Sequence, residues 1–510
     1  MVSPDNSGSV QQDTAPLSPI TASSSKEVSV PWDIKWYDRF VKVGSFQAYE
    51  YFEGGTERST QRTEFITNDQ IQAPDLKYPK LKLDELNARS TELRALKEEI
   101  QTQEENYVVR LTYQWKINEK LAEVEMLKTT LAMKNPSNTP EEKARLERNF
   151  RKYTEFIYGK PDKATFDTVV NQVRAKFEDI IAKEPETSTM RKYAIEALRT
   201  LPNNANPEVR AIAYNDRALD LLKVDTDKRL NALYDSSKLG DDPYKEVSSD
   251  LIVEVFTEAL ANLHADGWKV ITPKDGRSNV SVDQENKLVK VPEDSVRKYT
   301  VKDLRSLLAH EIVTHVANRT NGEKGIPGIN ARMLILGVGA DRYEAGEEGV
   351  AVGREASLDK SKIEITDGYE GYIAIGLAYG LDGEGKQRNF REVYESIKAM
   401  FIVDEFIDNK KKQEQNQKSD EACINDGLKY AFNRCVRSFR GTNCDAKGIV
   451  FTKDIIYRDG TIRVFDVINE NSGEIIRFSI GKHDPSNARH WWILSEMGIT
   501  EEALRSLSQN

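Results

Sequence analysis

The sequence predicts an α+β fold that contains much more helix than sheet. Apolar residues recur at helical spacing through most of the first half of the 510-residue chain. Short alternating segments that are typical of strands appear only after residue 250. We therefore expect a helical N-terminal layer, a small sheet over residues 268–291 and a C-terminal portion that closes a cleft.

The N-terminal half divides into a tail, an extension and a helical portion. Residues 1–31 are rich in Ser, Pro, Thr and Gln and lack apolar periodicity, so a disordered tail is predicted. Residues 32–74 form an N-terminal extension. Residues 75–250 form the helical portion of the main domain. Its apolar periodicity predicts a long helical pair over residues 83–133 and further helices over 144–157, 163–182 and 187–198.

Residues 251–408 carry the predicted sheet and its neighbouring helices. A helix is expected over 251–264, followed by a strand over 268–271 and an alternating pair of strands around Val280 and Val289. Another helix should begin at Thr300, whose hydroxyl can cap it while Asp303 completes a capping box. This helix is expected to end at Asn321-Gly322.

The C-terminal part begins after a charged segment. Residues 409–421 mix acidic and basic side chains, which predicts a solvated linker or an exposed helix end. Residues 422–510 are expected to form an α+β portion. Its strands are predicted over 455–457 and 462–467, with Asp459-Gly460 as the turn of a hairpin.

Composition limits the classes of function. The chain has 73 Lys and Arg against 83 Asp and Glu, a net charge of -10, so we do not expect nucleic-acid binding. Its apolar runs are too short to cross a membrane, and residues 1–32 lack the apolar run of a signal peptide. Cys423, Cys435 and Cys444 form no C-x-x-C pair. We expect reduced thiols and a cytoplasmic location.

Two of the five histidines occur within six residues, in His310-Glu311-Ile312-Val313-Thr314-His315. On an ideal α-helix the i,i+5 spacing places His310 and His315 about 140° apart, so they could not bind one ion. A shared metal requires a local π-type widening, in which about five residues complete one turn. The alternative is that His315 is a core histidine and His310 an exposed one.

A third ligand is available in Glu347-Glu348-Gly349-Val350-Ala351, in a second predicted helix. Catalytic zinc takes three protein ligands and keeps one position open. Acidic residues beside glycine and among alanine and valine are unusual on a solvated face. The alternative is an acidic helix start at the surface.

These motifs resemble those of the microtubule-associated tyrosine carboxypeptidases and their bacterial relatives. Those zincins carry H-E-x-x-x-H followed by an E-E-G-L-A or Q-E-G-L-E-A segment. The similarity covers LLAHEIVTHVANRTNG (307–322), GVGADRYEAGEEGVAV (337–352) and RCVRSFRGTNCDAKGIVFTKDIIYRDG (434–460). A weaker likeness extends over most of the chain from Ala73 onward.

The resemblance implies a zincin-like metallopeptidase whose small sheet lies beside the HExxxH helix. It implies that His310 and His315 bind zinc and that Glu311 is the general base. Glu348 is the better third ligand, because the family permits Gln at the position of Glu347. This chain has Gly346 where the family usually has Thr and Val350 where it has Leu, and we expect the glycine to loosen the start of the ligand helix.

The resemblance further implies a zinc-dependent carboxypeptidase that removes a C-terminal Tyr or Phe from a peptide or protein. A buried terminal carboxylate needs a fixed cation, for which Arg440 and Lys453 are the first candidates. Tyr343, Tyr457 and also Arg440 are candidate oxyanion donors. Asp454 could orient a histidine through its second nitrogen. A purely structural role is the alternative for each of them.

The expected partner is a peptide or protein C-terminus. Microtubule binding is not expected, because the chain is acidic and has no basic block. The alternative function is a catalytically idle zincin-like scaffold or a regulatory binding protein, in which the helices over 83–133 serve a partner. Zinc content separates the two functions.

Overall fold

The computed structural model describes residues 30–52, 58–203, 216–240, 242–274, 279–295, 298–325, 329–359, 368–383, 385–411 and 417–508. Nearly all of the predicted tail and residues 412–416 of the predicted linker lie outside these ranges. The described part is mostly helical with short strands, which confirms the α+β class. Within it, no helix combines the length and the apolar composition needed to cross a membrane.

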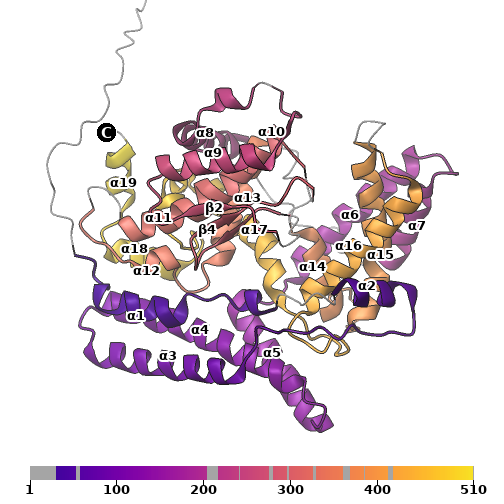
Figure 1. The fold of residues 1–510 in the computed structure, drawn as a ribbon, viewed down its shortest axis with the longest axis horizontal. Coiled ribbons are helices and arrows are strands. Elements are labelled where there is room, and N and C mark those ends of the chain that lie inside the picture. The colour runs from indigo at the N-terminus through magenta and orange to yellow at the C-terminus, as the bar shows by residue number, and fades with distance from the viewer. Residues whose placement is uncertain are drawn as a thin grey trace, which may run out of the picture.

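One layer of helices is built from the N-terminal part of the chain and lies along one side of the molecule (Figure 1). Its members are α1 (Ile34–Gly44), α3 (Leu83–Gln103), α4 (Tyr107–Met133) and α5 (Pro140–Tyr158). Side chains of Asn106 and Thr139 cap α4 and α5. Helices α3 and α4 pack on each other, so the predicted helical pair is confirmed.

A second group of helices gathers at the right of Figure 1. It consists of α2 (Arg58–Thr67), α6 (Lys163–Lys183), α7 (Thr189–Thr200), α14 (Tyr369–Tyr379), α15 (Phe390–Lys410) and α16 (Asp420–Phe439). Phe65, Tyr372 and Phe432 are fully buried in the core that these helices share. The helices predicted over 144–157, 163–182 and 187–198 correspond to α5, α6 and α7.

The sheet lies above the first layer and to the left of the second group in Figure 1. Strands β2 (Lys269–Ile271), β4 (Leu288–Lys290) and β3 (Ser281–Asp283) follow one another in that order across the sheet. Strand β4 is parallel to β2 and antiparallel to β3, with Val282 opposite Val289. Helices α8 (Asp216–Leu233) and α9 (Ser249–Asn262) pack in this region, and β1 (Glu246–Val247) pairs with β5 (Tyr299–Thr300). The strands predicted over 268–271 and around Val280 and Val289 are confirmed.

One continuous helical segment runs from Val301 to Lys324. It comprises α10 (Val301–Leu307), the π-helix η3 (Leu308–Val316) and α11 (Ala317–Lys324). The predicted capping box between Thr300 and Asp303 is present. Strand β3 contacts η3, so the sheet lies beside this helix as expected. Helices α12 (Ile335–Val338) and α13 (Glu344–Leu358) follow.

The predicted hairpin over residues 455–467 is wrong, because these residues belong to helix α17 (Ile455–Glu470). Residues 417–508 contain helices and no strand: α16, the 3-10 turns η6 (Thr452–Asp454) and η7 (Ser472–Ser479), α17, α18 (Ala488–Glu496) and α19 (Glu501–Ser508). Gly460 is not in a turn. A Cβ at this position would lie 1.9 Å from the carbonyl oxygen of Ala345 in α13, so the glycine permits close helix packing.

Candidate metal centre

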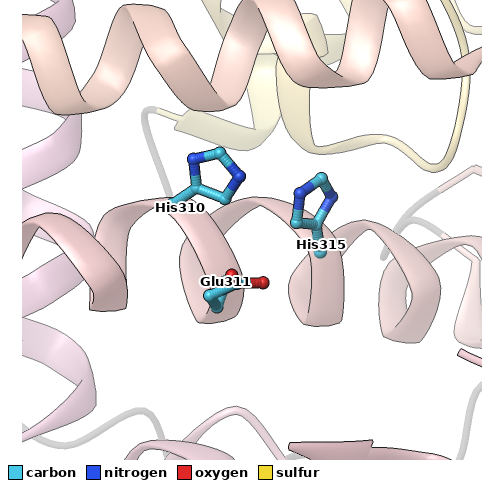
Figure 2. Close-up of side chains that lie close together, drawn as sticks. All are labelled: His310, Glu311 and His315. Carbon is cyan, nitrogen blue, oxygen red and sulfur yellow. The ribbon is translucent and has the colours of Figure 1, made fainter. Parts of the chain in front are cut away.

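The π-helix η3 brings the two histidines of the H-E-x-x-x-H motif onto one side (Figure 2). The ring centroids of His310 and His315 are 5.0 Å apart. The hydroxyl of Thr314 donates to the carbonyl oxygen of Ala309, five residues earlier, at 2.9 Å. The predicted π-type widening is confirmed, and the i,i+5 pair can face one ion.

Glu348 on α13 faces both imidazoles. Its Oε2 atom lies 3.5 Å from His310 Nε2 and 3.8 Å from His315 Nε2. The same oxygen is buried and has no hydrogen-bond partner. Two ligands of a tetrahedral zinc ion are about 3.4 Å apart, given bonds of about 2.1 Å. The two distances from Glu348 Oε2 are therefore slightly longer than, but close to, the spacing between two ligands of one zinc ion.

The second nitrogen of each imidazole meets a different carboxylate. His310 Nδ1 contacts Glu355, and His315 Nδ1 lies 3.1 Å from Glu347 Oε2. Glu347 is itself held by Lys482, whose Nζ atom lies 2.8 Å away. Metal-binding histidines almost always have such an outer partner, which fixes the ring and its tautomer.

The prediction that Asp454 orients a histidine is therefore wrong. The Asp454 carboxylate instead pairs with Arg434 at 2.8 Å and with Arg437 at 2.9 Å. Glu355 was not predicted. Its signal in the sequence was the i,i+7 spacing from Glu348, which places both on one face of a helix.

The charges around the two imidazoles favour a bound cation. Burial alone would lower the pKa of His310, but Glu355 and Glu348 raise it well above its usual value. Burial alone would raise the pKa of Glu348, but the facing His310 and His315 lower it to about 2. Four carboxylates, including Glu311 and Glu347, lie around the two imidazoles, and Lys482 pairs with only one of them, Glu347. This donor set suits a divalent ion such as zinc.

Glu311 lies beside the two imidazoles rather than between them (Figure 2). One ligand atom each of His310, Glu311 and His315 lies within 4.8 Å of the others, so Glu311 is a possible alternative ligand. Glu348 fits the third position better, because a single one of its oxygens faces both Nε2 atoms. Burial raises the pKa of Glu311, and the two histidines partly offset the increase.

A buried arginine joins the two helices of the centre. Arg354 on α13 donates to the carbonyl oxygen of Val313 at 2.8 Å and to the hydroxyl of Thr314 at 3.0 Å. Its other terminal nitrogen donates to Ser479 at 2.9 Å. These bonds fix the π-helix against the helix that carries Glu348. The sequence signal that was missed is a single arginine on an otherwise apolar stretch of α13.

The centre opens into a cavity of about 320 Å³. Of the predicted substrate and oxyanion residues, Lys453, Tyr343 and Tyr457 line it, so the C-terminal portion contributes to the cleft as expected. Arg440 is not in this lining. Its guanidinium stacks on Phe451, 4.7 Å from the ring centroid, whereas Arg437 reaches the cavity.

Glycines set the position of α13. A Cβ at Gly349 would lie 2.3 Å from the carbonyl oxygen of Gly460, and a Cβ at Gly346 would lie 2.4 Å from the Cα atom of Asp484. Gly346 therefore permits close packing of the segment around Asp484, and the expectation that it loosens the ligand helix is wrong.

Gly460→Ala is expected to displace α13 and with it Glu348. The added methyl group meets backbone atoms, which cannot move aside as a side chain can, so we expect a destabilisation of about 1–3 kcal/mol and weaker zinc binding. Gly353→Ala is the matched control on α13, because its nearest contact is the flexible Leu222 side chain at 3.3 Å. Urea unfolding and zinc titration of both variants measure the effect. Equal behaviour of the two variants would contradict it.

The chemistry that the centre can carry out follows from the side chains of His310, His315, Glu348 and Glu311. No protein-family model matches this chain, and no curated protein matches it either. The site consists of the imidazoles of His310 and His315, the Glu348 carboxylate oxygen that has no hydrogen-bond partner, and the neighbouring Glu311. Such a set can hold one metal ion and leave one position open for water or substrate.

Proposed function

We propose that this protein is a zinc-dependent metallocarboxypeptidase that removes a C-terminal aromatic residue from a peptide or protein. The observation that carries the proposal is the convergence of His310 Nε2, His315 Nε2 and Glu348 Oε2 beside Glu311. The first three residues would hold the ion. Glu311 would remain free for proton transfer.

When bound, zinc would lower the pKa of a water molecule towards about 7 and polarise the carbonyl group of the scissile bond. Glu311 accepts the proton at its carboxylate and passes it to the leaving amine. Its raised pKa suits a group that must both take and release a proton. Glu355 and Glu347 hold the Nδ1 side of the two imidazoles, so that the Nε2 atoms point inward.

Lys453 is the best candidate for the cation that binds a terminal carboxylate. It is buried in the cavity wall, 3.2 Å from Glu344 Oε2, with the rings of Tyr49 and Tyr457 at 4.8 and 5.5 Å. Burial alone would lower its pKa, but Glu344, Tyr457 and Glu348 raise it, so the ammonium group stays charged. The tyrosine rings provide apolar walls for an aromatic side chain.

Peptides that end in free Tyr or Phe should be shortened by one residue, and the same peptides capped as amides should be cleaved about 10- to 100-fold more slowly. The reason is the loss of a charged hydrogen bond to the anchoring cation. Lys453→Met should remove most of this preference, whereas Lys447→Met, at an exposed lysine, should keep it. Mass spectrometry of the products measures both. Equal cleavage of acid and amide, or cuts inside the peptide, would contradict a carboxypeptidase.

A further inference from the structure

A glutamine from the N-terminal extension lines the cavity of the metal centre. Gln47 lies between α1 and the 3-10 turn η1 (Ala48–Phe52). Gln47 is only 8% exposed, and its Oε1 atom is buried without a hydrogen-bond partner. A buried carbonyl oxygen with no donor is costly, so its presence in a binding cavity requires an explanation.

Helix α4 fixes the backbone on both sides of Gln47. Lys120 Nζ donates to the carbonyl oxygen of Phe46 at 2.7 Å, and Glu123 Oε2 accepts from the amide of Ala48 at 2.9 Å. Lys120 and Glu123 also pair with each other at 2.8 Å, and each side chain is 1% exposed. The two peptide groups that flank Gln47 are therefore held by buried charges. Such support is what a side chain needs if it is to bind a ligand in one fixed position.

A second amide oxygen in the wall of the same cavity also lacks a hydrogen-bond donor. Gln284, which follows β3, lines the same cavity, and its Oε1 atom is likewise buried without a partner. Tyr49, two residues after Gln47, lies under the Lys453 ammonium group in the same wall. Two amide oxygens thus lack donors in the cavity that also contains Lys453. A bound peptide can supply these donors through N–H or O–H groups.

We propose that Gln47 is a specificity-determining residue, whose side-chain carbonyl accepts a hydrogen bond from a donor on the terminal residue of the bound peptide. This inference rests on the proposed carboxypeptidase function and names a contact within that site. The donor is either the main-chain N–H of the terminal residue or the phenolic hydroxyl of a terminal tyrosine. A site built to hydrogen-bond a substrate group discriminates strongly against analogues that lack it.

The test measures peptide binding by zinc-loaded Glu311→Gln protein, so that no peptide is consumed. Two peptides that differ only in a terminal Tyr or Phe are titrated by calorimetry into this parent and into its Gln47→Met and Gln47→Asn derivatives. We expect both derivatives to bind the Tyr peptide about 5- to 30-fold more weakly. Gln72→Met, at an exposed glutamine of the same extension, is the matched control and should bind like the parent.

The Phe peptide identifies the donor. If its affinity is unchanged by Gln47→Met, the donor is the phenolic hydroxyl, and if both peptides weaken equally, the donor is the main-chain N–H. The inference would be overturned if the Gln47 variants bound both peptides within twofold of the parent, at unchanged zinc content and melting temperature. It would also be overturned if the parent bound neither peptide. The proposed function is tested separately with the wild-type protein. If the wild-type protein binds the peptides but does not shorten them, the proposed function is wrong.

Discussion

His315→Ala is expected to remove zinc and peptidase activity together. In the proposed site His315 would supply one of three ligand atoms, and Glu347 holds its Nδ1 side, so its loss leaves two of the proposed ligands, His310 and Glu348, with Glu311 as the nearest replacement. Loss of one of three protein ligands should reduce bound zinc from one per chain to a small fraction. Metal analysis by mass spectrometry and a peptide-trimming assay on the same sample measure the two losses.

Glu311→Gln is the matched variant on the same helix. It keeps the size of the side chain and removes the group that takes the proton, so zinc should stay while activity falls about 100- to 10,000-fold. A Glu311→Gln protein that trims peptides at the wild-type rate would falsify the general-base role. Loss of zinc from this variant would instead indicate that Glu311 is a ligand. Zinc content should be measured for this variant because Glu311 lies within 4.8 Å of the ligand atoms of both histidines.

Asp454→Ala is expected to destabilise the fold by about 3–5 kcal/mol. Asp454 is 2% exposed and pairs with Arg434 and Arg437, with Arg440 3.9 Å away, so its removal leaves three guanidinium groups without their shared carboxylate. Asp445→Ala is the control. Asp445 pairs with Lys143 at the surface, where a salt bridge contributes about 0–1 kcal/mol. Urea unfolding at pH 7 measures the difference between the two variants.

The same pair of proteins gives a pH test. Burial alone would raise the pKa of Asp454, but Arg437, Arg434 and Arg440 lower it below the usual 3.8. A carboxyl group whose folded-state pKa is lowered stabilises the fold above its unfolded pKa, and the contribution is lost as the pH falls through the folded-state pKa. The difference in unfolding free energy between wild type and Asp454→Ala should therefore have its full value above about pH 5 and decrease below pH 4. A gap that does not change with pH would contradict the ionised pair.

The helix geometry around the two candidate histidine ligands could be predicted because its signal is local. The i,i+5 spacing of His310 and His315 requires a widened helix if they share an ion, and the structure contains it. The Thr300 and Asp303 side chains lie within one turn of each other, so the capping box is also a local feature. The periodicity of α3 was readable for the same reason, since it buries one recurring set of mostly apolar residues. Helix α4 is buried on more than one face, and its buried residues include Lys120 and Glu123.

The remaining features depend on contacts between distant segments. Asp459-Gly460 has the composition of a hairpin turn, but in the structure Gly460 packs on Ala345 of a distant helix, and the buried residues Ile456, Val464 and Ile468 follow helical spacing. Arg440 lies away from the cavity because Phe451 and Asp454 hold it elsewhere. Gln47 reaches the centre only through the packing of the N-terminal extension on α4.

Anomalous diffraction at the zinc absorption edge, from crystals of the zinc-loaded protein, tests the central claim most directly. We predict one strong peak per chain, bonded to His310 Nε2, His315 Nε2 and a carboxylate oxygen of Glu348, with Glu311 outside bonding distance. A peak bonded to Glu311 in place of Glu348 would reassign the general base. The absence of any peak at the two histidines would contradict the metal centre and the peptidase function built on it.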